Sequence, residues 1–161
     1  MNNNTSGGIQ KITPFLWFDK EADEAAKFYT SIFKDSEIKD STTIENTSSG
    51  TTEIISIKLF GQEFNLISAG PYFKFTEAIS FVVNCETQEE IDYYWEKLSF
   101  DPKAEQCGWL KDKYGLSWQI VPTILPKMLQ DRDKKKVARV TDAFLKMKKF
   151  DIEALRRAYK G

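Results

Sequence analysis

Two stretches of this 161-residue chain alternate polar and apolar side chains, and their polar faces are the first candidates for chemistry. In residues 116–122, Ser117 and Gln119 share one face of a predicted strand, because side chains alternate along a strand. Glu63 and Asn65 share the polar face of an earlier stretch in the same way. A few hydroxyl, amide and carboxylate groups among apolar walls can orient a small ligand through hydrogen bonds. These four residues are therefore candidates for a ligand-binding cleft.

Three further residues are candidates for the same surface. Trp17 and Trp109 would supply flat apolar walls, although either could belong to the core instead. Cys107 would be a nucleophile if a neighbouring lysine lowered its pKa, but no base is evident beside it, which favours an inert thiol. Gln119 is equally well explained by a structural hydrogen bond, and Glu63 is more typical of a solvated rim charge than of an acid or base.

The chain contains no histidine, which excludes several classes of active site. Imidazole is the commonest metal ligand in proteins and the commonest general base near neutral pH. Ser-His-Asp catalysis, Cys-His catalysis and the two-His-one-carboxylate iron site are all excluded. No Gly-x-Gly-x-x-Gly sequence opens a helix after a strand, so we expect no nucleotide-type cofactor. No catalytic residue can be assigned from these observations.

The elements that position the candidate residues form one unit that occurs twice. The first copy predicts a strand, a helix and three strands, in residues 12–18, 20–33, 36–45, 51–60 and 61–68. The second predicts a strand, a helix and a hairpin, in residues 79–83, 86–98, 107–112 and 116–122. A shift of 65 residues relates the first strands and helices of the two copies, and a shift of 54 relates the later hairpins, which indicates an internal duplication. Each sheet would carry its helix on one face, and two such sheets facing one another would enclose a cleft.

The remaining segments flank these two modules, which we place at residues 11–70 and 71–126. Residues 1–10 are polar and rich in Gly and Ser, which predicts a flexible N-terminus and no secretion signal. Residues 127–161 hold 12 Lys and Arg against 5 Asp and Glu, whereas residues 1–126 hold 11 against 19. We predict helices in this basic extension at residues 125–129, 133–150 and 152–159.

The basic extension favours protein contacts over nucleic acid. Its cationic face lacks the interleaved aromatic residues that stack on bases, so docking on the acidic modules or on a partner subunit is favoured. No apolar run approaches the roughly 20 residues of a membrane helix. The two cysteines form no Cys-x-x-Cys pair, so reduced thiols in the cytoplasm are expected.

Three segments carry a family resemblance: ITPFLWFDKEADEAAKFYTSIF, GPYFKFTEAISFVVNCETQEEIDYYWEKL and QCGWLKDKYGLSWQIVP. They resemble the PhnB-like branch of the vicinal oxygen chelate superfamily, which includes glyoxalase I, bleomycin-resistance proteins and extradiol dioxygenases. The resemblance covers roughly residues 10–126. It implies an α+β fold of two βαβββ modules whose cupped sheets form the clefts, followed here by C-terminal helices. It also implies a homodimer.

The resemblance further implies that a metal site has been lost. Many members hold a divalent cation with a His on the first strand of each module and a Glu on the last. Here the Glu positions are Asn65 and Gln119, whose neutral amides are weaker ligands than a carboxylate. The His positions fall on residues that cannot bind a metal: Ile12 or Pro14 in the first module and Ala78 or Ile79 in the second.

The function that follows is binding of a small molecule without a metal, by a cytoplasmic homodimer whose ligand is unknown. The alternative is a glyoxalase- or dioxygenase-like enzyme with an atypical metal site built from Glu63, Gln119 and water. The ubiquinone-methyltransferase label that members of this branch often carry gains no support from the sequence. A regulatory role for the basic extension on nucleic acid is a weaker third interpretation.

Overall fold

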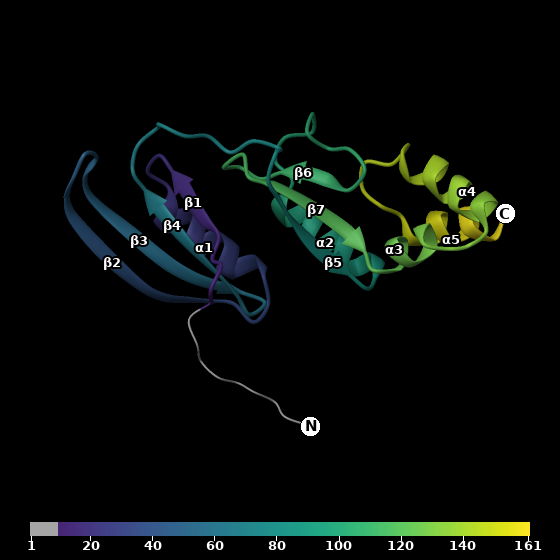
Figure 1. The fold of residues 1–161 in the computed structure, drawn as a ribbon, viewed down its shortest axis with the longest axis horizontal. Coiled ribbons are helices and arrows are strands. Elements are labelled where there is room, and N and C mark those ends of the chain that lie inside the picture. Colours follow the sequence, from purple (N-terminus) through teal and green to yellow (C-terminus); the bar gives the residue numbers. More distant parts are fainter. Residues whose placement is uncertain (1–9) are drawn as a thin grey trace, which may run out of the picture. The chain divides into compact units, whose positions relative to one another are not determined.

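The computed structural model describes residues 10–161, which divide into two compact units with the boundary between Lys74 and Phe75 (Figure 1). The basic extension, residues 127–161, is part of the second unit. The predicted flexible N-terminus falls, except for Gln10, outside the described residues. No helix within residues 10–161 is long and apolar enough to cross a lipid bilayer.

The first unit is a four-stranded sheet with one helix. Its elements in chain order are β1 (Phe15–Phe18), α1 (Ala22–Ile32), β2 (Glu37–Thr47), β3 (Gly50–Leu59) and β4 (Gln62–Ser68). The strands lie in the order β1-β4-β3-β2, with β1 parallel to β4 and the other neighbours antiparallel. All five elements were predicted within three residues of their observed ends.

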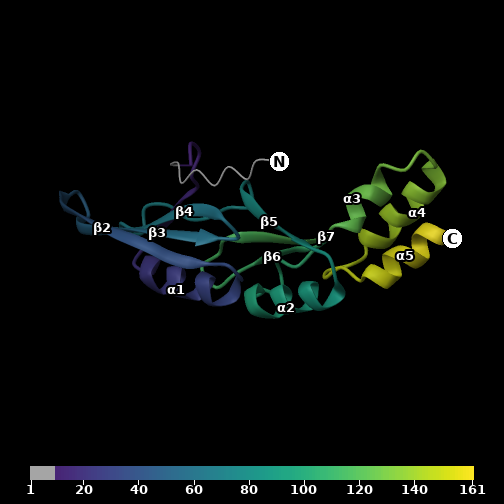
Figure 2. The same ribbon diagram turned by 90° about the horizontal axis from the view of Figure 1, so that it is seen from below.

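Helix α1 covers one face of this sheet because its apolar residues recur at helical spacing. Ala25, Ala26 and Tyr29 are fully buried, as are Ile57 of β3 and Leu66 of β4. Figure 2 shows α1 along one side of the sheet, and the opposite side carries no helix. The polar residues of β4 therefore lie on an uncovered face.

The second unit begins with a smaller version of the same arrangement. Its elements are β5 (Ser80–Cys85), α2 (Gln88–Leu98), β6 (Trp109–Lys111) and β7 (Ser117–Pro122), in the strand order β5-β7-β6. Strand β5 is parallel to β7, and β6 is antiparallel to it. The α+β class and the two sheets are confirmed, but the second sheet has three strands where a βαβββ module has four. Residues 99–108 form turns there, with one isolated bridge between Gln106 and Trp109.

The strand register corrects the alignment of the two copies. Phe15 lies opposite Asn65 in the first sheet, and Val82 lies opposite Gln119 in the second. If the two amides are equivalent, the first strands are related by a shift of 67 residues. The predicted shift of 65 still fits the helices, where it pairs the buried Tyr29 with Tyr94. The connection from first strand to helix is therefore two residues longer in the first copy, which an ungapped comparison cannot reveal.

Three helices complete the second unit: α3 (Ile124–Leu129), α4 (Lys134–Phe144) and α5 (Ile152–Lys160). The predicted helix over 133–150 is wrong at its C-terminal end, because α4 stops at Phe144. The backbone carbonyls of Met147 and Lys148 instead accept hydrogen bonds from the N–H groups of Cys107 and Gly108, at 2.9 and 2.7 Å. In a helix that ran to Phe150 these carbonyls would lie in the last turn and would have no intrahelical partner, whereas here Cys107 and Gly108 supply their partners.

Side chains fix the ends of the last two helices. Asp133 and Asp151 accept hydrogen bonds from backbone N–H groups in the first turns of α4 and α5, as N-caps do. Arg139 of α4 donates to the carbonyls of Ala158 and Tyr159 at the end of α5, each at 2.9 Å. A cation at the carbonyl end of a helix is favourably placed with respect to the helix dipole. Specific hydrogen bonds thus connect α4 and α5 within the basic extension.

Candidate functional site

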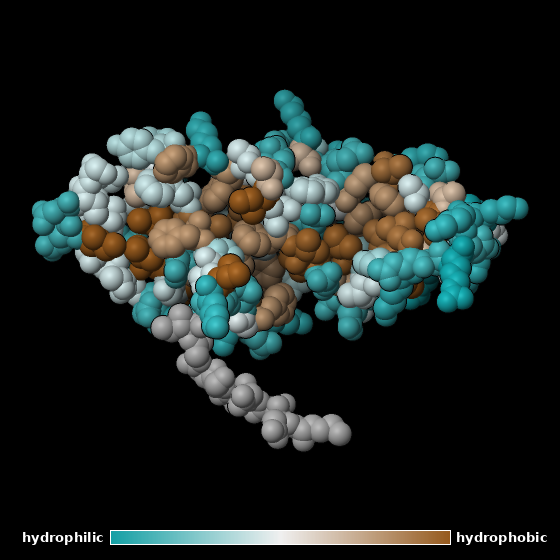
Figure 3. Space-filling model, viewed as in Figure 1, coloured by the Kyte–Doolittle hydropathy of each residue, from teal (hydrophilic) through white to brown (hydrophobic). Residues whose placement is uncertain are grey.

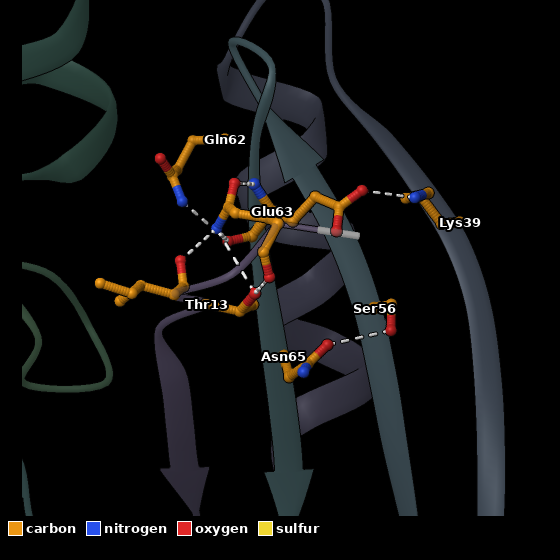
Figure 4. A network of polar contacts seen from close by, with 8 residues as sticks. Thr13, Lys39, Ser56, Gln62, Glu63 and Asn65 are labelled. Atoms are coloured by element: carbon orange, nitrogen blue, oxygen red, sulfur yellow. Dashed lines mark hydrogen bonds and ion pairs between the residues drawn. The ribbon is translucent and has the colours of Figure 1, made fainter. Parts of the chain in front are cut away.

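The uncovered face of the first sheet carries Trp17, Glu63 and Asn65, three of the predicted site residues. The Asn65 side-chain oxygen accepts a hydrogen bond from the Ser56 hydroxyl at 3.0 Å (Figure 4). The Trp17 indole donates to the carbonyl of Gly70 at 2.8 Å, and its ring lies edge-on to Phe73 with the ring centroids 5.0 Å apart. Trp17 is therefore fixed at the border of this face.

Glu63 forms an ion pair and is not the lone carboxylate that acid–base chemistry would favour. The Lys39 ammonium lies 2.5 Å from a Glu63 carboxylate oxygen (Figure 4), and this contact raises the pKa of Lys39. The backbone of Glu63 is also held, because its N–H donates to the Gln10 side-chain oxygen and its carbonyl accepts from the Gln10 amide. The charge of Glu63 is thus compensated by Lys39, and its backbone groups are paired as well.

The uncovered face of the second sheet carries Trp109, Ser117 and Gln119. Gln119 lies opposite Trp109 in the register of β6 and β7, and its amide donates to the Ser80 hydroxyl at 2.8 Å. Lys111 lies directly opposite Ser117 on the same face. Figure 3 looks onto the uncovered face of the second sheet and shows apolar side chains beside polar ones there. Val82 lies opposite Gln119 in the strand register and is 49% exposed.

A cavity of about 410 Å³ opens beside this second polar surface. Its wall includes polar, aromatic and charged side chains: Glu77, Gln106, Cys107, Trp109, Lys111 and Ser117. Three of the seven predicted site residues, Cys107, Trp109 and Ser117, are thus brought together in one place. Gln119 lies on the same face but does not line the cavity.

The Ser117 hydroxyl is the most unusual group in this cavity. The residue is only 1% exposed, and its oxygen has no hydrogen-bond partner among the described residues 10–161. Buried hydroxyls are normally paired, because an unpaired one loses its hydrogen bonds to water without replacement. No described residue therefore uses the donor or the acceptor capacity of this hydroxyl.

The cavity also holds one ion pair, between Lys111 and Glu77. The Lys111 ammonium lies 2.5 Å from a carboxylate oxygen of Glu77, and the hydrogen bond between them lowers the pKa of Glu77. The Glu77 side chain is 67% exposed and that of Lys111 only 23% exposed. The Lys111 ammonium thus lies in the cavity wall, and the more exposed Glu77 carboxylate lies at the cavity rim.

Neither cysteine has the surroundings of an activated nucleophile. The Cys107 sulfur lies 3.7 Å from the carbonyl oxygen of Phe144 and 3.8 Å from that of Leu145, and neither carbonyl is a base. Burial raises the pKa of the Cys85 thiol to about 12, which disfavours its reactive thiolate. Within residues 10–161, no cluster of three or more His, Cys, Asp or Glu side chains is placed to hold a metal ion.

Sequence reasoning missed several partners of the predicted residues. Gln119 is hydrogen-bonded to Ser80 and Asn65 to Ser56. Glu63 forms an ion pair with Lys39, and Lys111 forms one with Glu77. Alternation could have placed Ser80 on the face of Val82 and Lys111 on the face of Trp109. The contacts themselves depend on how strands pair, which alternation does not specify.

Comparison with known proteins agrees with this fold. The family described as 3-demethylubiquinone-9 3-methyltransferase matches residues 10–121. The chain belongs to this PhnB-like family. A solved structure from Bacillus cereus, named a putative 3-demethylubiquinone-9 3-methyltransferase and PhnB protein, is 40% identical. The match covers 71% of this chain and 100% of that one, with a TM-score of 0.59.

More distant structures share the fold of the family. The fosfomycin resistance protein FosX from Listeria monocytogenes matches 78% of this chain and 99% of its own, at 13% identity and a TM-score of 0.54. Protein PA1353 from Pseudomonas aeruginosa matches 70% and 97%, at 15% identity and a TM-score of 0.53. The PhnB-like family and FosX belong to the vicinal oxygen chelate superfamily, so the predicted superfamily is confirmed. No curated protein matches the chain.

Proposed function

We propose that this PhnB-like protein binds a small organic molecule without a metal, in the cavity beside the second sheet. The observation that supports the proposal is the Ser117 hydroxyl, which is buried in the cavity wall without a partner among the described residues. A buried polar group left without a hydrogen bond costs about 1–3 kcal/mol. A ligand that forms a hydrogen bond with this hydroxyl recovers this energy, which favours binding in the cavity.

The size and the lining of the cavity suit a compact ligand. A volume of about 410 Å³ lies within the range of roughly 300–1,000 Å³ that is typical of small-molecule sites. Trp109 supplies an apolar wall, and Ser117 and Lys111 supply polar groups at neighbouring positions. An apolar wall with a few directed polar groups is the usual composition of such sites.

Binding without a metal is proposed because the side chains at the expected metal positions are poor ligands for a divalent cation. Asn65 and Gln119 are each hydrogen-bonded to a serine hydroxyl, and neither side chain is a strong ligand for a divalent cation. Glu63, the carboxylate required by the alternative metal enzyme, is paired with Lys39. Methyltransferase activity is not carried over from the family description, because no Gly-x-Gly-x-x-Gly sequence follows a strand and opens a helix, and no nucleotide-type cofactor loop is evident.

Two measurements test this function. Purified protein is first assayed for bound transition metals, and we expect much less than one ion per chain. About one tightly held ion per chain, lost in Gln119→Ala, would favour the metal-enzyme alternative. The metal-free protein is then screened against a broad compound set by thermal shift, since a ligand specific to the folded state raises the unfolding temperature.

Two variants assign any shift to the cavity. Ser117→Ala should reduce the shift, whereas Thr52→Val should not. Thr52 carries the other buried hydroxyl without a partner among the described residues, but it lies in the first unit. A screen without any stabilising compound would refute the proposal, and so would shifts that are equal in all three proteins.

The homodimer is proposed from the family resemblance, and the cytoplasmic location from the two cysteines, which form no Cys-x-x-Cys pair. Light scattering of the purified chain at several concentrations tests the first, with twice the 18.6 kDa chain mass expected. A mass of one chain at all concentrations would refute it.

A further inference from the structure

We infer that the ligand of the second-sheet cavity carries an anionic group, such as a carboxylate, which Lys111 and Ser117 bind together in place of Glu77. This inference rests on the proposed function and narrows it to one chemical class. It depends on the register of two strands, on the unpaired hydroxyl and on the unequal exposure of the ion pair.

The register places both donors over the same part of the cavity. Lys111 of β6 and Ser117 of β7 lie directly opposite one another in an antiparallel pair, on the uncovered face of the sheet. Directly opposite residues have Cβ atoms about 4.5–5.5 Å apart. The long lysine side chain and the short serine side chain can therefore reach one small group between them, and both line the cavity.

The donors and acceptors of the two residues favour an anion over a neutral group. The Lys111 ammonium has three N–H donors and no acceptor, and the Ser117 hydroxyl can donate one hydrogen bond. A carboxylate accepts from both residues, and hydrogen bonds with one ionised partner are roughly twice as strong as neutral ones. A neutral amide would satisfy the hydroxyl but would not compete with Glu77 for the ammonium.

Glu77 is placed to give up its partner. It belongs to the connection before β5 and not to a strand, and its side chain is 67% exposed, against 23% for Lys111. When the ion pair opens, the carboxylate returns to water while the ammonium remains at the cavity wall. Exposed ion pairs contribute little to stability, so replacing Glu77 by a ligand carboxylate is not strongly opposed. Glu77 thus acts as a resident counterion that an anionic ligand displaces.

The rest of the ligand is expected to be flat and apolar. Trp109 precedes Lys111 by two residues on the same strand, so both side chains lie on one face. A planar ring can lie against the indole while its carboxylate reaches the two donors. Aryl carboxylates are therefore the simplest probes of the inference.

The test compares a panel of aryl carboxylates with their carboxamides by isothermal titration calorimetry, with 2-naphthoate and 2-naphthamide as the central pair. The two compounds have nearly the same shape and differ in charge. We expect the carboxylate to bind at least tenfold more tightly than the carboxamide. Lys111→Met should remove this difference, and Lys111→Arg should retain most of it. Glu77→Gln should tighten 2-naphthoate severalfold and leave 2-naphthamide unchanged.

Lys97→Met is the matched control. Lys97 also forms an ion pair, with Glu96, but it lies on α2 and does not line the cavity. Its removal changes the net charge by the same amount and should leave both affinities unchanged. An equal loss in Lys97→Met and Lys111→Met would show a nonspecific charge effect and would overturn the inference.

The outcomes separate the ligand class from the proposed function. Equal affinity for acid and amide, or tight acid binding that survives Lys111→Met, would overturn the anionic class. If that binding were still weakened by Ser117→Ala, the cavity would remain the binding site. Failure of every carboxylate in the panel would also overturn the anionic class, and the proposed function would then depend on the neutral compounds of the thermal-shift screen.

Discussion

Ser117→Ala should stabilise the protein without ligand, although it removes a polar group from a buried strand. Replacing a serine whose hydroxyl is hydrogen-bonded by alanine lowers the free energy of unfolding by about 1 kcal/mol. The Ser117 hydroxyl has no partner among the described residues, and leaving a buried polar group unpaired costs about 1–3 kcal/mol. The substitution removes this cost and loses the packing of a single oxygen atom. We expect the free energy of unfolding to rise by about 1 kcal/mol.

Urea unfolding followed by tryptophan fluorescence measures this change. Trp95, Trp109 and Trp118 report on the second unit, which contains Ser117, and Trp17 reports on the first unit, which contains the control positions. Thr52→Val is the control in the first unit and should also be stabilising, because the Thr52 hydroxyl is unpaired in the same way.

Ser56→Ala is a control for which the opposite change in the free energy of unfolding is expected, because this serine is hydrogen-bonded. The Ser56 hydroxyl donates to Asn65, so its removal should lower the free energy of unfolding by about 1 kcal/mol. If Ser117→Ala were as destabilising as Ser56→Ala, the Ser117 hydroxyl would have a partner in solution. The unmet hydrogen bond that supports the proposed function would then not exist.

Three further predictions concern the second unit. Gly108→Ala should lower the free energy of unfolding by about 2–4 kcal/mol in the same assay, because a Cβ there would lie 2.4 Å from a Phe150 ring carbon at a φ of +82°. In native protein, a thiol reagent should modify Cys107 and leave the fully buried Cys85 unmodified until urea is added; rapid modification of both would contradict the structure. Between pH 9 and 12 the urea midpoint should fall, because burial raises the pKa of both Cys85 and Tyr94 to about 12 in the folded state. The unfolded chain then binds fewer protons than the folded one, so stability decreases as the pH rises, and Cys85→Ala should weaken the decrease.

The local elements could be predicted from the sequence because each is specified by nearby residues. Tyr29 and Ile32 mark the buried stripe of α1, and Asp151, a residue type that favours N-cap positions, caps α5. The end of α4 could not be predicted in this way. Beyond that end, the carbonyls of residues 147 and 148 accept hydrogen bonds from the N–H groups of Cys107 and Gly108, which lie in a distant part of the chain.

The candidate site was predictable in its faces but not in its contacts. Alternation placed Asn65 and Gln119 on uncovered faces, because a strand has only two faces to choose between. The sequence did not indicate that the Ser80 hydroxyl would accept the hydrogen bond from Gln119, because alternation gives the face of a strand but not the pairing between strands.

The two copies have kept a polar pair on the uncovered face but have built it from different strands. The partner of Asn65 is Ser56 on β3, which runs antiparallel to β4, whereas the partner of Gln119 is Ser80 on β5, which runs parallel to β7. The two equivalent amides are thus hydrogen-bonded to serines on different neighbouring strands. This indicates that the positions stayed polar in both copies, whereas the geometry around the amides did not stay the same.

The surroundings of the two pairs differ in a way that assigns binding to one of them. In the first copy the Glu63 carboxylate is satisfied by Lys39, and its backbone groups are satisfied by Gln10. In the second copy the Ser117 hydroxyl, which has no partner among the described residues, lies in the cavity wall, where the one cation is neutralised by a carboxylate at the rim. The first copy also has such a hydroxyl, on Thr52, but Thr52 does not line this cavity. A surface whose polar groups are already paired gains little from a ligand, whereas an unpaired hydroxyl beside a displaceable counterion gains both contacts. Binding that is sensitive to Ser117 and Lys111 but insensitive to Glu63 is therefore the pattern that this asymmetry requires.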